Sequence, residues 1–454
     1  MSVSAGATAV RRGQISAVEV ISSALDRSES SQDTLNTYTL IDREGALERA
    51  EIIDEMAARG QDPGPLAGVP IALKDLIDQA GLPTTCGSGF YERISDRSAT
   101  VVERLEAAGA VIIGRTGLHE FAYGFSSENH WFGPVRNPWD TQTSPGGSSG
   151  GSAVAVAAGL AAAAIGTDTG GSVRVPAGMC GIVGLKVTHG RVPLTGVFPL
   201  ALSLDTVGPL GRSVEDVALL YAALAGHDPN DPWSAPRPVP TPGEVPPDLS
   251  GIRIGLPYPW ISDAPTTPGV ATAFATAIDR ISDAGAIITA LQAPALIPSP
   301  HGGSIVGGEA AKVHRPWFGK QPYGPAVAER LRTAFEVTID QYIDALEWTA
   351  KLRNATAAVF QDVDLLMTPT VAATRKVIGE PTIDGIPYRR VLSWFSSLVN
   401  HIGVPALSVP LRAPGTPPPS LQLVAPWWAE KRLFAVGRAL ETLGIATFSA
   451  PPIP

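Results

Sequence analysis

Residues 144–184 read SPGGSSGGSAVAVAAGLAAAAIGTDTGGSVRVPAGMCGIVG, and this stretch decides the fold of the chain. Two clusters of glycine and serine, at 146–152 and 169–172, stand on either side of a segment of small apolar residues. That segment is too apolar for a solvated linker and too short to cross a membrane, so we expect it to be buried. Its alanines favour a helix, and Gly159 predicts a break before a strand that ends near Gly166.

A loop, helix, strand and loop in this order bring the two ends of the stretch together. We therefore expect Ser148 and Ser172 to approach each other, because the small side chains between them allow close packing. Two glycines directly before Ser172 let the backbone take positive φ, so successive N–H groups can point into one concavity. Such a concavity can stabilise the oxyanion that forms in acyl transfer. Ser172 is therefore the candidate nucleophile.

A serine nucleophile needs a base to accept its proton. The sequence after Ser172 is Val-Arg-Val, which does not match the G-x-S-x-G elbow, so a Ser-His-Asp triad has no support. Lys74 is the best candidate for the base, because it lies in the apolar run GVPIALKDLI at 68–77, which predicts a buried strand. Burial would draw the pKa of a lysine down from about 10.4 towards 7, so that its neutral form could take up a proton.

Three segments together carry a resemblance to a known family. They are GVPIALKDLI at 68–77, PGGSSGGSAVAVAAG at 145–159 and GTDTGGSVRVPAGMCGIVGLKVTHGRVP at 166–193. In order and spacing these segments resemble the amidase signature family, and the resemblance extends over most of the chain. A glycine-serine cluster alone is typical of a flexible loop, and a lone lysine beside an aspartate is typical of a solvated pair. The joint occurrence of all three segments argues against both.

The resemblance implies a role for each residue of the candidate site. It makes Ser172 the nucleophile, Ser148 a bridging serine that follows Gly147 through a cis peptide bond, and Lys74 the terminal base. The implied reaction passes a proton from Ser172 through Ser148 to neutral Lys74, forms an acyl-enzyme and returns the proton to the leaving nitrogen.

Further residues are expected to support this reaction. The N–H groups expected to hold the oxyanion are those of Thr169, Gly170, Gly171 and Ser172. The residues expected to support the catalytic groups are Gly147, Ser149, Asp168 and Arg174, of which Asp168 and Arg174 would hold the loop by charge-assisted hydrogen bonds.

Composition narrows the function class. The chain has 454 residues, 44% of them hydrophobic, with a net charge of −9 at pH 7, which argues against a nucleic-acid surface and favours an enzyme of small molecules. Two cysteines cannot form a disulfide framework, and neither a signal peptide nor an apolar run of membrane-spanning length is present, so we expect a cytoplasmic protein that does not bind membranes. The seven histidines lack metal-ligand spacing, so we expect no metal and no cofactor.

The predicted elements indicate an α/β fold with a mixed, largely parallel twisted sheet covered by helices on both faces. We expect a single amidase signature domain over 1–454. It divides into N-terminal helices (1–65), a catalytic core (66–227), a proline-rich connector (228–250) and a variable, substrate-side half (251–454). Within these, helices are predicted at 16–25 and 44–59, a capped helix begins at Thr100, and 299–325 is predicted to be an irregular, lid-like segment.

Seven aromatic residues are candidates for a wall around the substrate, and aromatic walls suit apolar or aromatic substrates. They are Phe121, Tyr123, Phe125, Trp317, Phe318, Trp394 and Phe395. The first three lie in a stretch that borders the substrate channel in the family. Each of the seven could equally fill the core between helices, and the sequence leaves this open.

The substrate class is narrowed by two further resemblances. The stretches FAYGFSSEN at 121–129 and LQLVAPWWAEKRL at 421–433 are similar to the carboxybiuret hydrolase and urethane-cleaving branch of the family. We therefore expect a small amide or carbamate, such as an aryl amide or a urethane, to be hydrolysed by a monomer or homodimer.

Two alternatives remain open. One is a glutaminase-type subunit of an amidotransferase, in which an aspartate helps to bind glutamine. Alignment on Asn400 and Gly403 puts Ser393 at that position, which argues against this role. The other alternative is a binding protein of the same fold that has lost the chemistry, and the presence of all three candidate catalytic residues argues against it.

Overall fold

The stretch at 144–184 folds into the helix, strand and helix around which the rest of the molecule is built. Helix α5 (Gly150–Ala157) is buried along its whole length, strand β8 (Ala163–Asp168) follows it, and α6 (Arg174–Cys180) comes after the second glycine-serine cluster. Gly159, with a φ of 78°, separates α5 from β8. The predicted break at Gly159 is confirmed.

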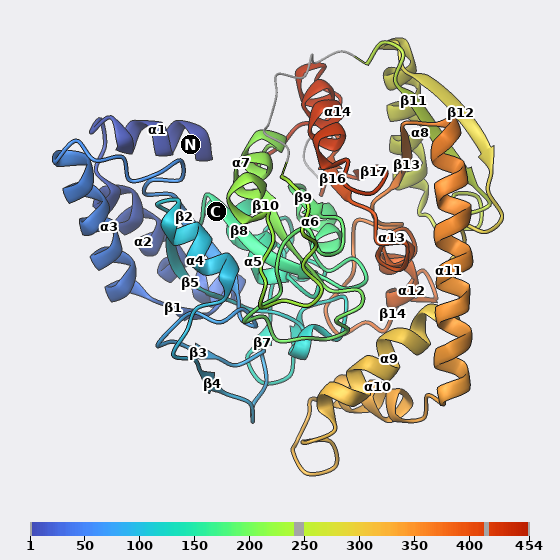
Figure 1. The fold of residues 1–454 in the computed structure, drawn as a ribbon, viewed down its shortest axis with the longest axis horizontal. Helices are drawn as coiled ribbons and strands as arrows, with labels where there is room; N and C mark the ends of the chain where they lie inside the picture. Colours follow the sequence, from blue (N-terminus) through green and yellow to red (C-terminus); the bar gives the residue numbers. More distant parts are fainter. Residues whose placement is uncertain (1, 240–248, 413–416, 453–454) are drawn as a thin grey trace.

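The computed structural model describes residues 2–239, 249–412 and 417–452, and its centre is a sheet of eleven strands (Figure 1). Their order in the sheet is β1, β5, β2, β8, β10, β9, β16, β17, β13, β11, β12. The strands are β1 (Tyr38–Ile41), β2 (Pro70–Lys74), β5 (Val111–Thr116), β8, β9 (Val183–Lys186), β10 (Thr206–Gly211), β11 (Arg253–Tyr258), β12 (Ile287–Gln292), β13 (Leu365–Pro369), β16 (Ala406–Pro410) and β17 (Ser420–Val424). The sheet thus joins strands from both halves of the chain.

The sheet is mixed, as predicted, but it is not largely parallel. Within the described sheet, parallel pairing joins β2 to β5 and β8, and β11 to β12 and β13. The pairs between β8 and β13 through the centre are antiparallel, and so is the pair of β1 with β5. Antiparallel neighbours need no crossover helix, so the alternation of strands and helices along the chain did not predict the central pairings.

Helices cover both faces of the sheet, which confirms the predicted α/β layering. On one face, α5 and α6 share an apolar core with α2 (Ala17–Leu35) and α3 (Arg43–Ala58). On the other face, α4 (Thr100–Ala107), α7 (Val214–Leu224) and α14 (Glu430–Thr442) form a second core. Strand β2 shows the reason: Ile71 and Leu73 enter the second core while Ala72 enters the first, because side chains alternate along a strand.

The remaining helices and short ribbons complete the molecule. Helices α9 (His301–His314), α10 (Pro325–Phe335) and α11 (Ile339–Asp362) form the right-hand side of Figure 1, opposite α1 (Val3–Arg11), α2 and α3. The others are α8 (Pro268–Asp283), α12 (Tyr388–Ser393), α13 (Ser397–Ile402), the short 3₁₀ turn Glu120–Ala122, and the paired strands β3 (Pro83–Thr84) with β4 (Arg93–Ile94), β6 (Glu128–Asn129) with β7 (Gly133–Pro134) and β14 (Thr382–Ile383) with β15 (Ile386–Pro387). Among the described residues, no helix is both long enough and apolar enough to cross a membrane.

Three predicted elements differ from the structure. The helix predicted at 16–25 continues to Leu35, where Asn36 ends it in the left-handed conformation. The helix at 100 is preceded by Ala99, whose side chain cannot cap it, so the predicted capping box is wrong. The segment 299–325 begins with the regular helix α9, in which Gly302 serves close packing and not flexibility: a Cβ there would lie 2.6 Å from His401 Nε2.

The proline-rich connector is described only in part. Residues 228–239 contain neither helix nor strand. At the start of this segment, the carboxylates of Asp228 and Asp231 accept hydrogen bonds from backbone amides two residues further on and so form turns. Residues 240–248 lie outside the described residues. The division of the chain into one domain with these four parts stays a prediction.

Candidate active site

The loop between β8 and α6 carries Ser172 and is folded around one buried carboxylate. Asp168 Oδ2 lies 3.0 Å from Arg174 Nε, and Asp168 Oδ1 lies 2.9 Å from a terminal nitrogen of the same guanidinium. The amide of Gly171 also donates to Asp168, at 2.8 Å. Burial alone would raise the pKa of Asp168, but the Arg174 guanidinium outweighs this effect and holds that pKa well below its usual range. The carboxylate therefore stays charged and keeps the loop closed.

The same loop presents backbone N–H groups beside Ser172. Gly171 has a φ of 129°, and a Cβ there would lie 2.1 Å from Ser396 Oγ, so only glycine fits. Because its N–H donates to Asp168, Gly171 does not supply the free donor that the sequence analysis expected. The amides of Thr169, Gly170 and Ser172 have no acceptor among the described residues, so these three remain the candidate oxyanion donors.

Lys74 ends strand β2 inside the protein and is fully buried. Its Nζ donates to Ser148 Oγ at 2.7 Å and to Thr167 Oγ1 at 2.9 Å. Burial lowers the pKa of Lys74 from 10.5 to about 7, against the opposing charges of Asp168 and Asp205. A substantial fraction of Lys74 is therefore neutral near pH 7, and a neutral amine can accept a proton from the hydroxyl that it contacts.

The two glycine-serine clusters meet, as predicted from their spacing. The amide of Ser149 donates to the carbonyl of Ser172 at 3.2 Å, and Ser149 Oγ donates to the Thr167 carbonyl at 3.2 Å. Gly147 precedes Ser148 through a cis peptide bond, and a Cβ on Gly147 would lie 2.8 Å from two backbone nitrogens. Gly147 and Ser149 thus lie where the sequence analysis expected supporting residues.

Several polar residues that the sequence did not indicate also support this loop. Asn400 Oδ1 and Gln422 Oε1 each accept from Arg174 at 2.7 Å. Asp205 accepts from the Thr169 hydroxyl, and burial raises the pKa of Asp205 to about 7. Asn400 and Gln422 lie more than 200 residues after Arg174, so no spacing rule could have predicted that they contact it.

A cavity of about 170 Å³ opens at Ser172. Its wall includes Thr169 and Gly170 from the loop, Tyr123 and Phe125 from the stretch at 121–129, and residues of α9 to α13. An apolar cavity of about 150 Å³ holds a molecule as large as benzene, so this one accommodates a small substrate group. Burial lowers the pKa of the lining residue His401 to about 4, so this imidazole is neutral.

Five of the seven candidate aromatic residues do not line this cavity. Phe121 is buried among Phe90, Phe198, His314 and Tyr323, and Trp317 packs edge-on against Tyr91. Phe318 stacks on Phe335 at 4.4 Å, while Trp394 donates to the Trp260 carbonyl and Phe395 packs beside Trp260. Phe121, Trp394 and Phe395 lie in the core, and the half-buried Trp317 and Phe318 pack against it, so none of the five lines the cavity as expected.

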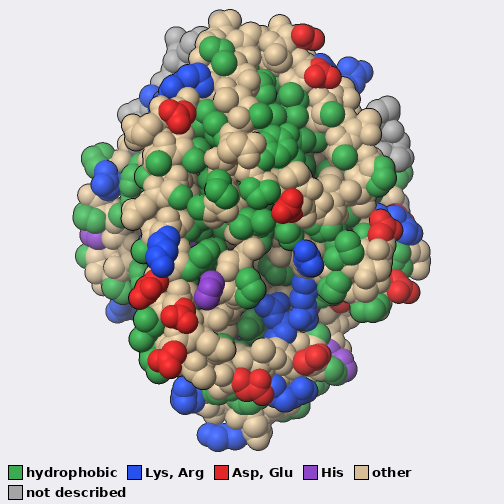
Figure 2. Space-filling view, turned by 90° about the vertical axis from the view of Figure 1, so that its right-hand side faces the viewer, with side chains coloured by type: hydrophobic (Ala, Val, Ile, Leu, Met, Phe, Trp, Pro, Cys, Tyr) green, Lys and Arg blue, Asp and Glu red, His purple; other side chains and the backbone are tan. Residues whose placement is uncertain are grey.

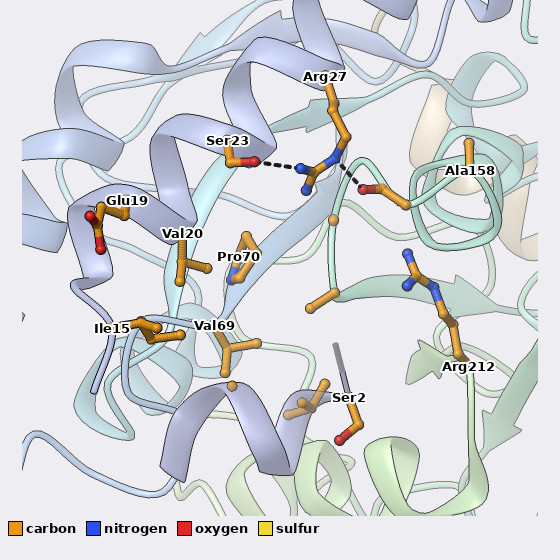
Figure 3. A pocket seen from close by; sticks show the side chains of 16 residues that line it. Ser2, Ile15, Glu19, Val20, Ser23, Arg27, Val69, Pro70, Ala158 and Arg212 are labelled. Carbon is orange, nitrogen blue, oxygen red and sulfur yellow. Dashed lines mark hydrogen bonds between the residues drawn. The ribbon is translucent and has the colours of Figure 1, made fainter. Parts of the chain in front are cut away.

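A larger cavity of about 520 Å³ lies away from Ser172, between α1, α2 and the end of α5 (Figure 3). Arg27 and Arg212 line it, and each donates to a backbone carbonyl near the C-terminus of α5, that of Gly159 and that of Val156. These arginines supply hydrogen-bond donors to carbonyl groups at the C-terminal end of α5, which have no partner within the helix. Among the described residues no cluster of His, Cys, Asp and Glu is arranged to hold a metal ion.

Comparisons with known proteins agree with this geometry. A family model described as Amidase matches residues 19–312 and 316–434. The chain is 39% identical to the A subunit of the glutamyl-tRNA(Gln) amidotransferase from Carboxydothermus hydrogenoformans, over 95% of both chains, and 38% identical to that from Acidothermus cellulolyticus, over 94% of this chain and 91% of the relative.

Solved structures show the same fold. One belongs to a vestigial protein complex that reveals the evolutionary origins of an s-triazine catabolic enzyme, with a TM-score of 0.92 and 32% identity over 99% of this chain and 100% of the other. A 6-aminohexanoate cyclic dimer hydrolase has a TM-score of 0.88 and 27% identity over 100% of this chain and 99% of its own.

Proposed function

The chain belongs to the amidase signature family, and on that premise we propose that it hydrolyses a carboxylic amide, or a related acyl C–N bond such as a carbamate, through an acyl-enzyme on Ser172. The membership itself makes it an amidase-type hydrolase. The bond, the substrate and the catalytic residues are our proposal. The observation that carries it is the buried Lys74, whose Nζ lies 2.7 Å from Ser148 Oγ, next to the loop that bears Ser172.

In the first half of the proposed reaction, Ser172 Oγ bonds to the carbonyl carbon of the substrate. Its proton passes to Ser148 Oγ, and the proton of Ser148 passes to neutral Lys74. The carbonyl oxygen becomes an oxyanion that the amides of Thr169, Gly170 and Ser172 stabilise. When the C–N bond breaks, the proton returns through Ser148 to the leaving nitrogen, because an unprotonated amine anion is a poor leaving group.

In the second half, water attacks the ester on Ser172. The same relay takes a proton from the water, the ester C–O bond breaks and Ser172 recovers its proton. The products are a carboxylic acid, or a carbamic acid from a carbamate, and the free amine. Side chains and backbone amides supply every step of this sequence.

Intact mass measurement tests the proposal. The protein is exposed briefly to a fluorophosphonate, to anilides and to nitrophenyl carbamates, and Ser172→Ala is compared with the wild type. We expect one adduct on the wild type and none on Ser172→Ala. Ser152→Ala is the matched control, because Ser152 is a buried serine of the same stretch that bonds to Thr116 and to the Ile165 carbonyl and lies outside the cavity. Equal labelling of Ser172→Ala and the wild type would disprove the assignment.

A second candidate function is that of a glutaminase-type subunit, which the 39% identity to the A subunit of an amidotransferase favours. Ser393 argues against this role. It stands where the glutamine-binding aspartate would align, it lines the cavity, and its hydroxyl donates to the Arg389 carbonyl at 2.7 Å. Two measurements on the isolated chain separate the two roles: ammonia release from glutamine, and the native mass. Ammonia release would favour the glutaminase-type subunit. No ammonia release, with the native mass of a monomer or homodimer, would favour the predicted cytoplasmic hydrolase.

A further inference from the structure

The imidazole of His401 lies on the wall of the catalytic cavity without a hydrogen-bond partner. The residue is 5% exposed, its Nδ1 atom is buried, and no described residue bonds to either ring nitrogen. The two other buried histidines of the described chain each have a side-chain partner. His314 Nδ1 lies 3.0 Å from the Tyr323 hydroxyl, and His119 Nδ1 lies 3.5 Å from Ser126 Oγ. His401 therefore differs from both in leaving its donor and its acceptor unused beside a cavity.

This unpaired state of His401 is costly. Burial lowers the pKa of His401 to about 4, so near pH 7 the ring is neutral and has one N–H donor and one bare nitrogen that can accept. A buried polar group without a partner destabilises a protein, because it has lost its hydrogen bonds to water. Other polar side chains of the same wall have partners: Thr169 donates to Asp205, and Ser393 donates to the Arg389 carbonyl. A bound molecule that pairs with the imidazole would remove this cost.

Neighbouring side chains hold the His401 ring in position. Trp348 of α11 packs edge-on against it, with 5.1 Å between the ring centres. A Cβ on Gly302 of α9 would lie 2.6 Å from Nε2, so the ring occupies space that only glycine leaves open. Helices α9, α11 and α13 all contribute to the cavity wall, and Figure 2, which views the molecule from the side of α9 to α11, shows a hollow in this face. The imidazole is thus fixed at the boundary of the cavity before a ligand binds.

The place of His401 on α13 limits which part of a ligand it can reach. This helix starts against the loop of Ser172, where Ser396 Oγ donates to the Gly170 carbonyl at 2.8 Å. Ser397 and His401 both line the cavity, and residues four apart on a helix lie one above the other, separated by about one turn. A group bonded to His401 is therefore about one helical turn from the loop, a distance that roughly three or four covalent bonds span.

We infer that His401 hydrogen-bonds a second, uncharged polar group in the acyl part of the substrate, such as a distal amide. This inference rests on the proposed cleavage at Ser172. An amide offers an acceptor oxygen and N–H donors, so it can pair with either nitrogen of a neutral imidazole. The group belongs to the acyl part, because that part stays at Ser172 through both halves of the reaction, whereas a bond to the amine would slow its departure. His401 thus determines specificity: an apolar analogue of the same shape leaves the imidazole unpaired.

Two amides of the same shape test the inference. 4-Methylpentanamide is succinamide with its distal amide replaced by an isopropyl group, and ammonia release reports the cleavage of both. We expect the wild type to favour succinamide in kcat/KM by about 5- to 100-fold per amide group, the range for leaving one buried polar group unpaired. His401→Leu should lose this preference. His401→Gln keeps a donor and an acceptor, so it should retain part of the preference.

His314→Leu is the matched control. His314 is a buried histidine of α9 that does not line the cavity and already bonds to Tyr323, so its loss should leave the preference for succinamide unchanged. The ratio of two rates measured on one preparation does not depend on the folded fraction. A variant that folds poorly therefore still reports whether the preference is kept.

Equal cleavage of the two amides by the wild type would overturn the inference. A His401→Leu variant that keeps the wild-type preference, whatever its rates, would show that the imidazole only supports the fold. If the wild type cleaves neither amide, protection of Ser172 from a fluorophosphonate decides: succinamide must protect at a lower concentration than 4-methylpentanamide in the wild type but not in His401→Leu, and any other result overturns the inference. Failure of the wild type to react with the fluorophosphonate would instead refute the proposed function, and this inference with it.

Discussion

Replacing Lys74 by methionine separates catalysis from stability. Methionine has a similar length and no charge, so the substitution removes the proton acceptor and its bonds to Ser148 and Thr167. We expect the rate of acylation of Ser172 to fall about 10²- to 10⁴-fold, the usual contribution of a general base. The wild-type rate should rise about tenfold per pH unit up to pH 7 and level off above it, because only neutral Lys74 accepts a proton. The variant should lose this inflection.

The same pKa gives the sign and size of an effect on stability. The folded pKa of about 7 lies below the unfolded value of 10.5, so between these pH values the unfolded chain binds the extra proton. The free energy of unfolding therefore rises with pH through this window, by up to ~5 kcal/mol for the difference of about 3.5 units at 1.36 kcal/mol each. Lys74→Met should lack the part of the rise that Lys74 contributes, as measured by urea denaturation at pH 7 and pH 9.

Lys186 offers a matched control. It is also fully buried, burial lowers its pKa to about 7, and its Nζ donates only to the carbonyls of Val187 and Val404. Lys186→Met should lose a similar part of the pH-dependent stability while the inflection in acylation stays near pH 7. The reasoning fails if Lys74→Met keeps more than a tenth of the wild-type rate, or if the inflection follows Lys186.

Three further predictions concern the loop around Ser172. Gly171→Ala should abolish fluorophosphonate labelling, because the added Cβ would lie 2.1 Å from Ser396 Oγ, and Ser396→Gly in the same chain should restore part of it unless the positive φ alone is decisive. Asp205→Asn should stabilise the protein at pH 8 but not at pH 4, because the raised folded pKa of about 7 makes the folded chain lose stability as pH rises from 3.8 to 7; equal unfolding midpoints at pH 8 would contradict this. Arg174→Met should lower the free energy of unfolding by about 3–5 kcal/mol, since it leaves Asp168 charged and unpaired; a loss below about 1 kcal/mol in chemical denaturation would show that the pair contributes little.

Much of the candidate site could be predicted from local sequence. Glycines before Ser172 let the backbone take positive φ, and small residues from 153 to 165 allow close packing, so the approach of the two serine clusters could be predicted from their spacing. The apolar run around Lys74 predicted a buried strand, and burial is what lowers the pKa of Lys74. The amide of Gly171 was predicted wrongly. It donates to Asp168 and is therefore not free to stabilise an oxyanion.

The aromatic wall could not be predicted in the same way. Tyr123 and Phe125 line the cavity, whereas Phe121, two residues earlier, lies in the core. An aromatic ring gains similar free energy from either environment, so its residue type carries no information about which one it enters. The helix α9 was predicted to be an irregular segment for a related reason. Glycine suits both a flexible loop and a close helix contact, and only the contact of Gly302 with His401 shows which of the two applies.

The family could be predicted from three quoted segments, and the α/β layers and the approach of Ser148 to Ser172 from short-range backbone preferences and the alternation of buried and exposed residues. Which polar groups meet depends on how the folded layers pack. Asn400 and Gln422 bond to Arg174, and Arg330 reaches the cavity of Ser172, across more than 150 residues of chain. Contacts at such separations depend on how whole layers pack, and no local pattern records that.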